Sequence, residues 1–131
     1  MRAIALILPL ALAACLPQQD PAPDGASDFA YFCADCHGSR GDGKGELAHD
    51  LPKAPADLTA LRQSHGGAFP GTKVMAKVWG PMAPQDQHAI MPGFAALFES
   101  DLVPYDGGDG VYTPTPRRLV AISEYLKTIQ R

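Results

Sequence analysis

Cys33-Ala34-Asp35-Cys36-His37 is the stretch from which the rest of this chain is interpreted. Two cysteines three residues apart, with a histidine directly after the second, form the attachment pattern of a c-type haem. Residues three apart share one face of a helical turn, so both thiols point toward one edge of a flat macrocycle. The pattern predicts one covalent haem c, with thioether bonds from Cys33 and Cys36 and with iron bound by His37.

Two other roles of paired cysteines fit less well. A thioredoxin-like CxxC follows a β-strand, but residues 27–32 (SDFAYF) predict a helix. A structural zinc site needs four ligands, commonly two cysteine pairs, and the only other cysteine is Cys15. The haem interpretation is therefore favoured.

Further motifs extend the case. A glycine-rich run, GDGKG, occupies residues 41–45, and Met91-Pro92-Gly93-Phe94 lies far downstream. With the attachment motif, these make residues 28–131 resemble a monohaem class I c-type cytochrome. The resemblance implies an all-α fold of about four to five short helices, with long loops wrapped around one covalent haem. It also implies iron ligated by His37 and Met91, and transfer of single electrons.

Composition is consistent with one small domain. The chain has 131 residues, of which 46% are hydrophobic and 19% charged, with 13 glycines and 13 prolines. So much glycine and proline predicts a loop-rich fold. A buried macrocycle would add apolar area that a domain of about 100 residues cannot easily supply from its own side chains.

The N-terminal region predicts export. Residues 1–14 have a positive start, an apolar run and small residues at the end, as in a signal peptide, and they are too few to span a bilayer. Ala14-Cys15 resembles a bacterial lipobox, in which Cys15 is lipidated; the alternative is an ordinary signal that leaves a stray thiol. The proline-rich residues 15–27 would then tether the haem domain, residues 28–131, to the periplasmic side of a membrane.

A methionine is expected to be the second axial ligand of the iron. Pro92 biases Met91 toward extended backbone, which can project a thioether across a haem face. Met82 lacks this constraint, and Met75 lies in a predicted helix as core filling. Met91 is therefore the first choice. The remaining histidines lie in predicted loops and are expected to be solvated: His49, His65 and His88.

The resemblance also implies a support for His37. In the family, a proline carbonyl after the attachment site accepts the Nδ1 proton of the ligating histidine. Pro52 and Pro55 are both candidates, and the sequence does not choose between them. Trp79 is predicted to be core, with donation to a haem propionate as its alternative role.

Periodicity and capping residues predict the helices. The first begins after Ser27 or Asp28 and ends at Gly38, and residues 58–62 follow an Asp57 cap. Helical periods also occupy residues 73–79, after Thr72, and 94–98. Residues 102–114 are predicted to be a turn-rich surface loop.

The last helix is expected to begin after a Thr115 cap and to cross the first helix. Its apolar face would contain Leu119, Ile122, Leu126 and Ile129. Arg117 and Arg118, at its N-terminal end, are expected to be solvated.

Charge bounds the class of partner. The net charge is −3, and removal of Arg2 with the signal makes the chain more acidic, which argues against a nucleic-acid partner. The prediction is a lipid-anchored single-electron carrier, not an enzyme, that exchanges electrons with redox proteins in the periplasm or membrane. The alternatives are a haem enzyme or gas sensor with an open sixth iron position, and a fixed haem subunit of a larger dehydrogenase or oxidase.

Overall fold

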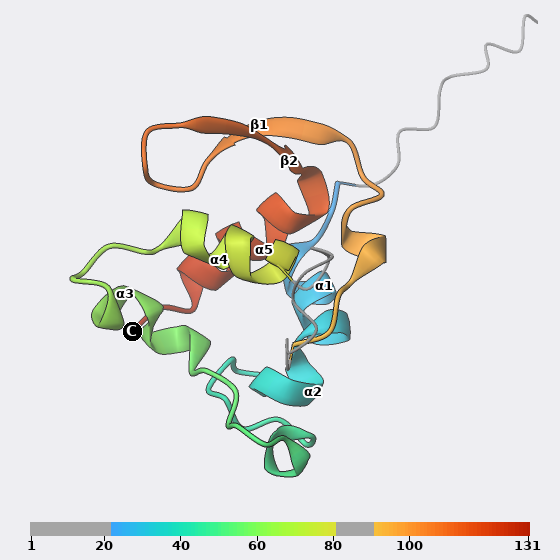
Figure 1. The fold of residues 1–131 in the computed structure, drawn as a ribbon, viewed down its shortest axis with the longest axis vertical. Helices are drawn as coiled ribbons and strands as arrows, with labels where there is room; N and C mark the ends of the chain where they lie inside the picture. Colours follow the sequence, from blue (N-terminus) through green and yellow to red (C-terminus); the bar gives the residue numbers. More distant parts are fainter. Residues whose placement is uncertain (1–21, 81–90) are drawn as a thin grey trace, which may run out of the picture.

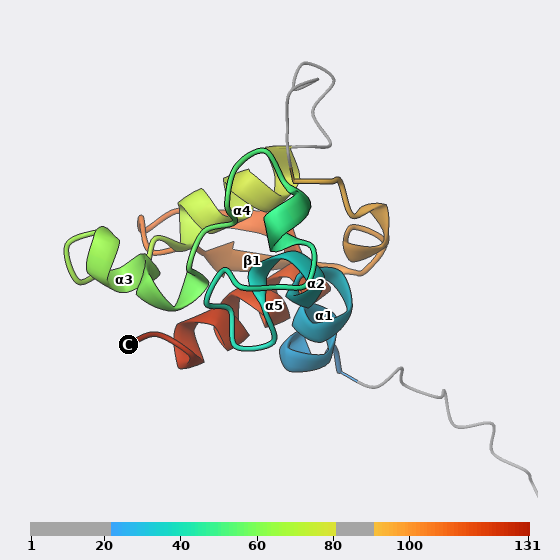
Figure 2. The same ribbon diagram turned by 90° about the horizontal axis from the view of Figure 1, so that it is seen from below.

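Helices from the two ends of the domain pack against each other in this computed structural model, which describes residues 22–80 and 91–131. Helix α1 (Gly25–Phe32) and helix α5 (Arg117–Thr128) lie side by side (Figures 1 and 2). Their contact buries Phe29 and three residues of α5, Leu119, Ile122 and Leu126, to between 1% and 3% exposure. The predicted apolar face of the last helix and its packing on the first are confirmed.

Gly25 allows the two backbones to approach. A Cβ atom at this position would lie 2.0 Å from the carbonyl oxygen of Ala121 in α5. A backbone oxygen cannot move aside as the end of a flexible side chain can, so a side chain here would push the helices apart. The absence of a side chain is therefore part of the contact between α1 and α5.

Helix α1 begins earlier than predicted. Its N-cap is Asp24, whose carboxylate accepts hydrogen bonds from Ala26 N (3.1 Å) and Ser27 Oγ (2.6 Å). Asp28 is not a cap but is buried, at 8% exposure, and forms an ion pair with Arg118. The prediction that Arg118 is solvated was therefore wrong, because its partner lies 90 residues away in the sequence and no local pattern marks it.

Short elements connect α1 to α5. Helix α2 (Ala34–His37) follows a break at Cys33 and ends at Gly38, as predicted. The segments η1 (Ala48–Asp50), η2 (Leu58–Ala60) and α3 (Leu61–Ser64) come next, followed by α4 (Gly71–Trp79) and η4 (Ala95–Leu97). Asp57 caps η2 as predicted, by accepting from Thr59 N at 2.9 Å.

Two predicted caps were wrong. Helix α4 has Pro70 at its N-cap, while the Thr72 hydroxyl donates to Asp109 at 2.9 Å instead of capping the helix. Helix α5 has Pro116 at its N-cap, and Thr115 belongs to the preceding strand. Both differences involve the residues before α5, which were predicted to be a loop and are not: Asp109 binds the Thr72 hydroxyl, and Thr115 lies in a strand.

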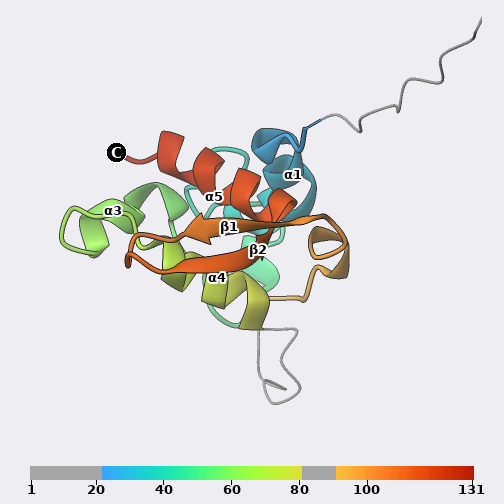
Figure 3. The same ribbon diagram turned by 90° about the horizontal axis from the view of Figure 1, so that it is seen from above.

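A β-hairpin corrects the all-α prediction. Strands β1 (Leu102–Asp106) and β2 (Tyr112–Pro116) pair antiparallel, from Leu102↔Pro116 to Asp106↔Tyr112. The part of the chain that the structure describes is thus a mixed fold of five α-helices and one two-stranded sheet. Figure 3 shows the hairpin lying across α4 and α5.

The prolines of the hairpin explain why the strands were missed. Proline cannot donate to a ladder and normally argues against a strand. Here Pro104 pairs with Pro114, and Pro116 with Leu102, so the prolines occupy alternate pairs, and only every other pair of an antiparallel ladder exchanges hydrogen bonds. The turn is closed by the Asp106 carboxylate, which accepts from three backbone N–H groups: Gly108 (2.8 Å), Asp109 (3.1 Å) and Gly110 (3.0 Å).

We predict that Gly25→Ala destabilises the protein by about 1–3 kcal/mol, as is typical of overpacking. The new methyl group would meet the Ala121 carbonyl. Urea unfolding followed by circular dichroism measures the change. Gly80→Ala is the matched control, because Gly80 has a helical φ of −52° and no atom of the described residues lies within 4 Å of its Cβ position. Equal unfolding midpoints for the two variants would contradict the role given to Gly25.

Candidate functional site

Cys33, Cys36, His37 and Met91 all line one cavity of about 480 Å³. The first three come from the junction of α1 and α2, and Met91 precedes η4. The structure thus brings together the four residues that the sequence predicted as haem-binding, although 54 positions separate His37 from Met91. The volume lies in the range of about 300–1,000 Å³ found for ligand and cofactor sites.

The walls of this cavity are mainly apolar and come from α1, α2, η2, α3, α4 and α5, and from residues that follow η1 and precede η4. The apolar lining includes Phe29, Phe32, Leu51, Leu58, Leu61, Val74, Val78, Phe94, Ile122 and Leu126. Several of these side chains also belong to the core or pack against it. An apolar, flat group of cofactor size would therefore bury side chains that are only half-buried in the protein alone.

His37 is held in one orientation. Its Nδ1 lies 3.0 Å from the carbonyl oxygen of Ala56. Because a carbonyl only accepts hydrogen bonds, Nδ1 is the protonated nitrogen and Nε2 keeps its lone pair for a metal. This is the arrangement that fixes the tautomer of metal-binding histidines in general.

The acceptor differs from both prolines considered from the sequence. Pro52 and Pro55 were the candidates, but the carbonyl used is that of the next residue, Ala56. The Pro55 carbonyl instead faces the glycine loop, where a Cβ atom on Gly43 would lie 2.7 Å from it. The loop was correctly identified, but the sequence does not show which carbonyl faces the histidine.

The C-terminus of the domain anchors the segment that carries Ala56. Arg131 forms an ion pair with Asp57, and Arg131 N donates to Thr59 O at 3.0 Å. The Gln130 side chain donates to Leu58 O at 2.7 Å. These contacts fix the chain directly after Ala56 and therefore the carbonyl that orients His37.

The glycine loop caps α2. Gly43 N donates to His37 O (2.7 Å), and Gly45 N donates to Cys36 O (3.2 Å). A Cβ atom on Gly45 would lie 2.2 Å from Asp35 O. Glycine thus lets the loop approach the end of α2 and satisfy carbonyls that have no partner within the helix.

The environment of Cys33 does not favour thiol–disulfide chemistry. Burial, together with the nearby Asp28 and Cys36, raises the pKa of the Cys33 thiol to about 12, whereas reactive redox cysteines have lowered values. Cys33 and Cys36 are not joined in a disulfide. Residues before Cys33 form helix α1, as predicted, and not the strand of a thioredoxin-like motif.

The other sulfur candidates lie elsewhere. Met75 packs against the core and lines a different cavity, in agreement with its predicted role as core filling. Met82 and His88 fall outside the residues that the structure describes, as do Cys15 and residues 1–14, the predicted signal peptide. Met91 is thus the methionine that the described part of the chain places with His37.

The histidines divide into two kinds. His49 is exposed and lies 3.6 Å from Asp50, which agrees with the prediction of a solvated side chain. His65 is half-buried and lines the large cavity, with Nδ1 2.8 Å from Leu61 O. Its predicted solvation was therefore wrong, because the ring contacts the Leu61 carbonyl in α3 and lines the cavity.

Trp79 does not serve the large cavity. Its side chain is 52% exposed, and its ring packs edge-on against Phe98 with 4.7 Å between centroids. Trp79 lines the smaller cavity that also contains Met75, and it does not line the large one. Neither a buried core position nor donation to a haem propionate is therefore supported.

Three lysines line the large cavity that no sequence pattern had singled out as site residues. Lys53, Lys73 and Lys77 line it, and no aspartate or glutamate does so in the described residues. In an acidic chain this is a local reversal of charge. It favours an anionic group at the cavity, such as the carboxylates of a haem.

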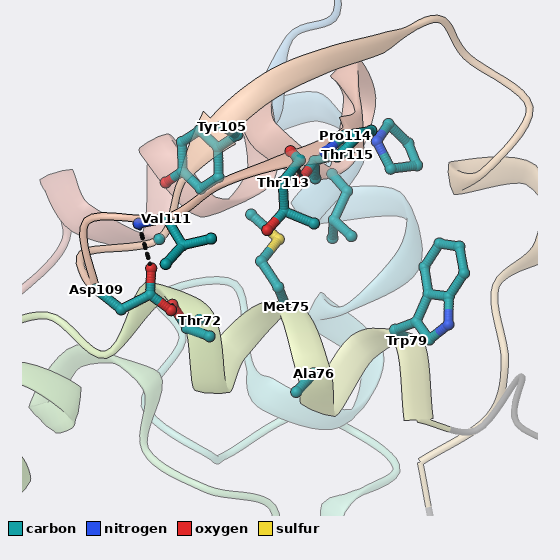
Figure 4. A pocket seen from close by; sticks show the side chains of 13 residues that line it. Thr72, Met75, Ala76, Trp79, Tyr105, Asp109, Val111, Thr113, Pro114 and Thr115 are labelled. Carbon is teal, nitrogen blue, oxygen red and sulfur yellow. Dashed lines mark hydrogen bonds between the residues drawn. The ribbon is translucent and has the colours of Figure 1, made fainter.

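A second cavity of about 340 Å³ lies between α4 and the hairpin. Figure 4 shows Met75 at its centre, with Trp79 at one end and Asp109 at the other. The Asp109 carboxylate is already engaged by Val111 N (3.0 Å) and the Thr72 hydroxyl (2.9 Å). This cavity contains none of the cysteine or histidine side chains discussed above.

Within residues 22–80 and 91–131, no three His, Cys, Asp or Glu side chains are grouped to hold a metal ion, and a His/Met pair is not such a group. In the same residues no helix has the length and apolar character to cross a bilayer. Comparison with family models, curated proteins and solved structures finds no match to this chain.

We predict a pH-dependent contribution from Asp57 to stability. Hydrogen bonds from Thr59, with help from Arg131, hold the pKa of Asp57 below its ordinary value of 3.8. Since the folded pKa is depressed, the charge stabilises the protein fully above about pH 5, and the effect is lost as the pH falls through the folded pKa.

Asp57→Asn keeps a capping oxygen and removes the charge, so it should lower the melting temperature at pH 7, by an amount that shrinks as the pH falls below 3.8 and through the folded pKa. Thermal melts from pH 2 to 7 measure this difference. Asp50→Asn, at an exposed carboxylate near only His49, is the control. A difference at position 57 that does not vary with pH would refute the electrostatic account.

Proposed function

We propose that this protein is an exported c-type cytochrome that carries single electrons through one covalent haem. The observation that carries the proposal is the shared cavity: two thiols, an oriented imidazole and a thioether line one apolar space. The proposal does not include the all-α fold implied by the family resemblance, because strands β1 and β2 form a hairpin.

The residues present fit such a group. Cys33 and Cys36 would hold it through thioether bonds, in which each S–H adds across a vinyl C=C so that no atom leaves. A thioether is neutral, so the burial that disfavours a Cys33 thiolate does not oppose the bonded sulfur. His37 would bind iron through Nε2 while its Nδ1–H donates to Ala56 O.

Met91, which lines the same cavity, would be the second protein ligand of the iron. When bound, the iron supplies reversible one-electron chemistry. The protein contributes a fixed pair of ligands, and apolar walls that exclude water and so tune the reduction potential. A fixed coordination requires little rearrangement on electron transfer, which suits a carrier rather than an enzyme.

Export and lipidation remain proposals from the sequence. Cys15 would carry the lipid, and the residues up to Asp24, which caps α1, would link it to the domain. We propose redox proteins of the periplasm or membrane as partners. A permanent place as the haem subunit of a larger dehydrogenase or oxidase would use the same residues.

We predict that the double variant Cys33→Ala/Cys36→Ala contains no covalent haem. The pyridine haemochrome spectrum of the native protein should be that of a haem with two thioether bonds, and the variant should lose it after acid–acetone extraction. The single variants should each retain one bond and a shifted spectrum. Native protein that releases all its haem on extraction would sink the attachment proposal.

A further prediction separates carrier from enzyme or sensor. Oxidised native protein should show the weak near-infrared sulfur-to-iron charge-transfer band. Met91→Ala should lose that band, have a lower reduction potential and bind carbon monoxide when reduced, because a soft ligand that favours ferrous iron is gone.

Met75→Ala is the matched control, since Met75 lines the other cavity, and it should keep the band. Met82→Ala tests the alternative ligand and should also keep it. Rapid carbon monoxide binding by the reduced native protein would indicate an open iron position and favour the enzyme or sensor.

A further inference from the structure

Arg118 connects the two segments that carry the proposed iron ligands. Its Nε donates to Asp28 Oδ2 at 3.0 Å and its Nη2 to Asp28 Oδ1, so the guanidinium binds both carboxylate oxygens. Asp28 belongs to α1, five residues before Cys33, and is buried. A charge-assisted, bidentate pair of this kind fixes orientation as well as distance.

The same guanidinium reaches the segment that follows Met91. Arg118 Nη1 donates to Ala96 O, in η4, at 3.2 Å, and Arg118 N donates to Ser100 Oγ at 3.2 Å. One residue at the start of α5 therefore contacts both α1 and residues 96–100.

An aromatic pair lies between these two contacts and the cavity. The Arg118 guanidinium carbon is 5.3 Å from the centroid of the Phe32 ring. Phe32 packs edge-on against Phe94, with 5.7 Å between centroids, and both rings line the large cavity. Phe32 directly precedes Cys33, and Phe94 follows Met91 by three residues.

We infer that Arg118 is a positioning residue that holds the Met91 segment against the haem-attachment helix. Arg118 contacts Asp28, Phe32 and Ala96 together. It thereby sets the distance between the side of the cavity that carries Cys33 and Cys36 and the side that carries Met91. The inference rests on the proposed function, because only a group bound across the cavity gives that distance a chemical role.

The test compares Arg118→Lys with Arg117→Met in the holoprotein. Lysine keeps the positive charge next to Asp28 but cannot form the planar fork that reaches Asp28 and Ala96 together. Arg117 is the matched control, because it precedes Arg118 in α5 and its guanidinium, within the described residues, pairs with the exposed Asp101, at 3.4 Å.

Hydrogen exchange followed by mass spectrometry is the first measurement. In Arg118→Lys, the amides of Leu97 and Phe98, which donate to Phe94 O and Ala95 O, should exchange about ten-fold faster, as expected when one hydrogen bond from a charged group is lost. Amides of α4 should be unchanged. Arg117→Met should match the native protein at both places.

The near-infrared band during heating is the second measurement. In Arg118→Lys the band should disappear well below the temperature at which helicity is lost, and carbon monoxide should bind the reduced protein in that interval. Loss of the band only together with global unfolding, or unchanged exchange at residues 97–98, would overturn the inference.

The two proposals fail separately. A native protein without the band, but with faster exchange at residues 97–98 in Arg118→Lys, would remove Met91 as ligand and retain Arg118 as the residue that holds this segment. A native protein with the band and an unaffected Arg118→Lys variant would retain the proposed function and remove the role of Arg118.

Discussion

The packing of α1 on α5 determines where the proposed haem-binding residues lie. α1 ends at Phe32, so its position sets that of Cys33 and of α2 directly after it. The contact depends on Gly25, where the two backbones are too close for a side chain, and on the buried pair of Asp28 with Arg118. A buried carboxylate without its partner would be strongly unfavourable, so this pair also disfavours other registers of the two helices.

The core of the described residues is small for the cavity that it borders. Six apolar residues are buried, and twelve more residues are only partly buried against them. Many of the partly buried ones line the large cavity, including Phe32, Leu58, Val74 and Met91. A flat apolar occupant would complete this core, because it would cover the partly buried side chains that line the cavity.

The sequence predicts those features that depend on local pattern. The CxxCH spacing singled out Cys33, Cys36 and His37, which line one cavity in the structure. Helical periodicity identified the buried face of α5, because burial on a helix repeats every three to four residues. The pairing of Arg118 with Asp28 and the choice of Ala56 O were missed, because both depend on contacts between distant segments. The hairpin was missed because three prolines in two short strands imitate a loop.

The hairpin affects the candidate site because it packs on α4, a helix whose two faces line different cavities. Lys73, Val74, Lys77 and Val78 line the large cavity, whereas Thr72, Met75, Ala76 and Trp79 line the smaller one beneath the hairpin. Residues three or four apart share a helix face, so α4 is a wall between the two spaces.

The hairpin supports this wall from behind. Gly107 O accepts from Thr72 N at 3.1 Å, and Asp109 accepts from the Thr72 hydroxyl at 2.9 Å. At its other side, Tyr105 donates to Glu124 in α5 at 2.7 Å. The strands that the sequence failed to predict therefore join α4 to α5, the two helices that contribute Val78 and Ile122 to the same cavity. A fold without the hairpin would have to hold α4 against the cavity by other contacts.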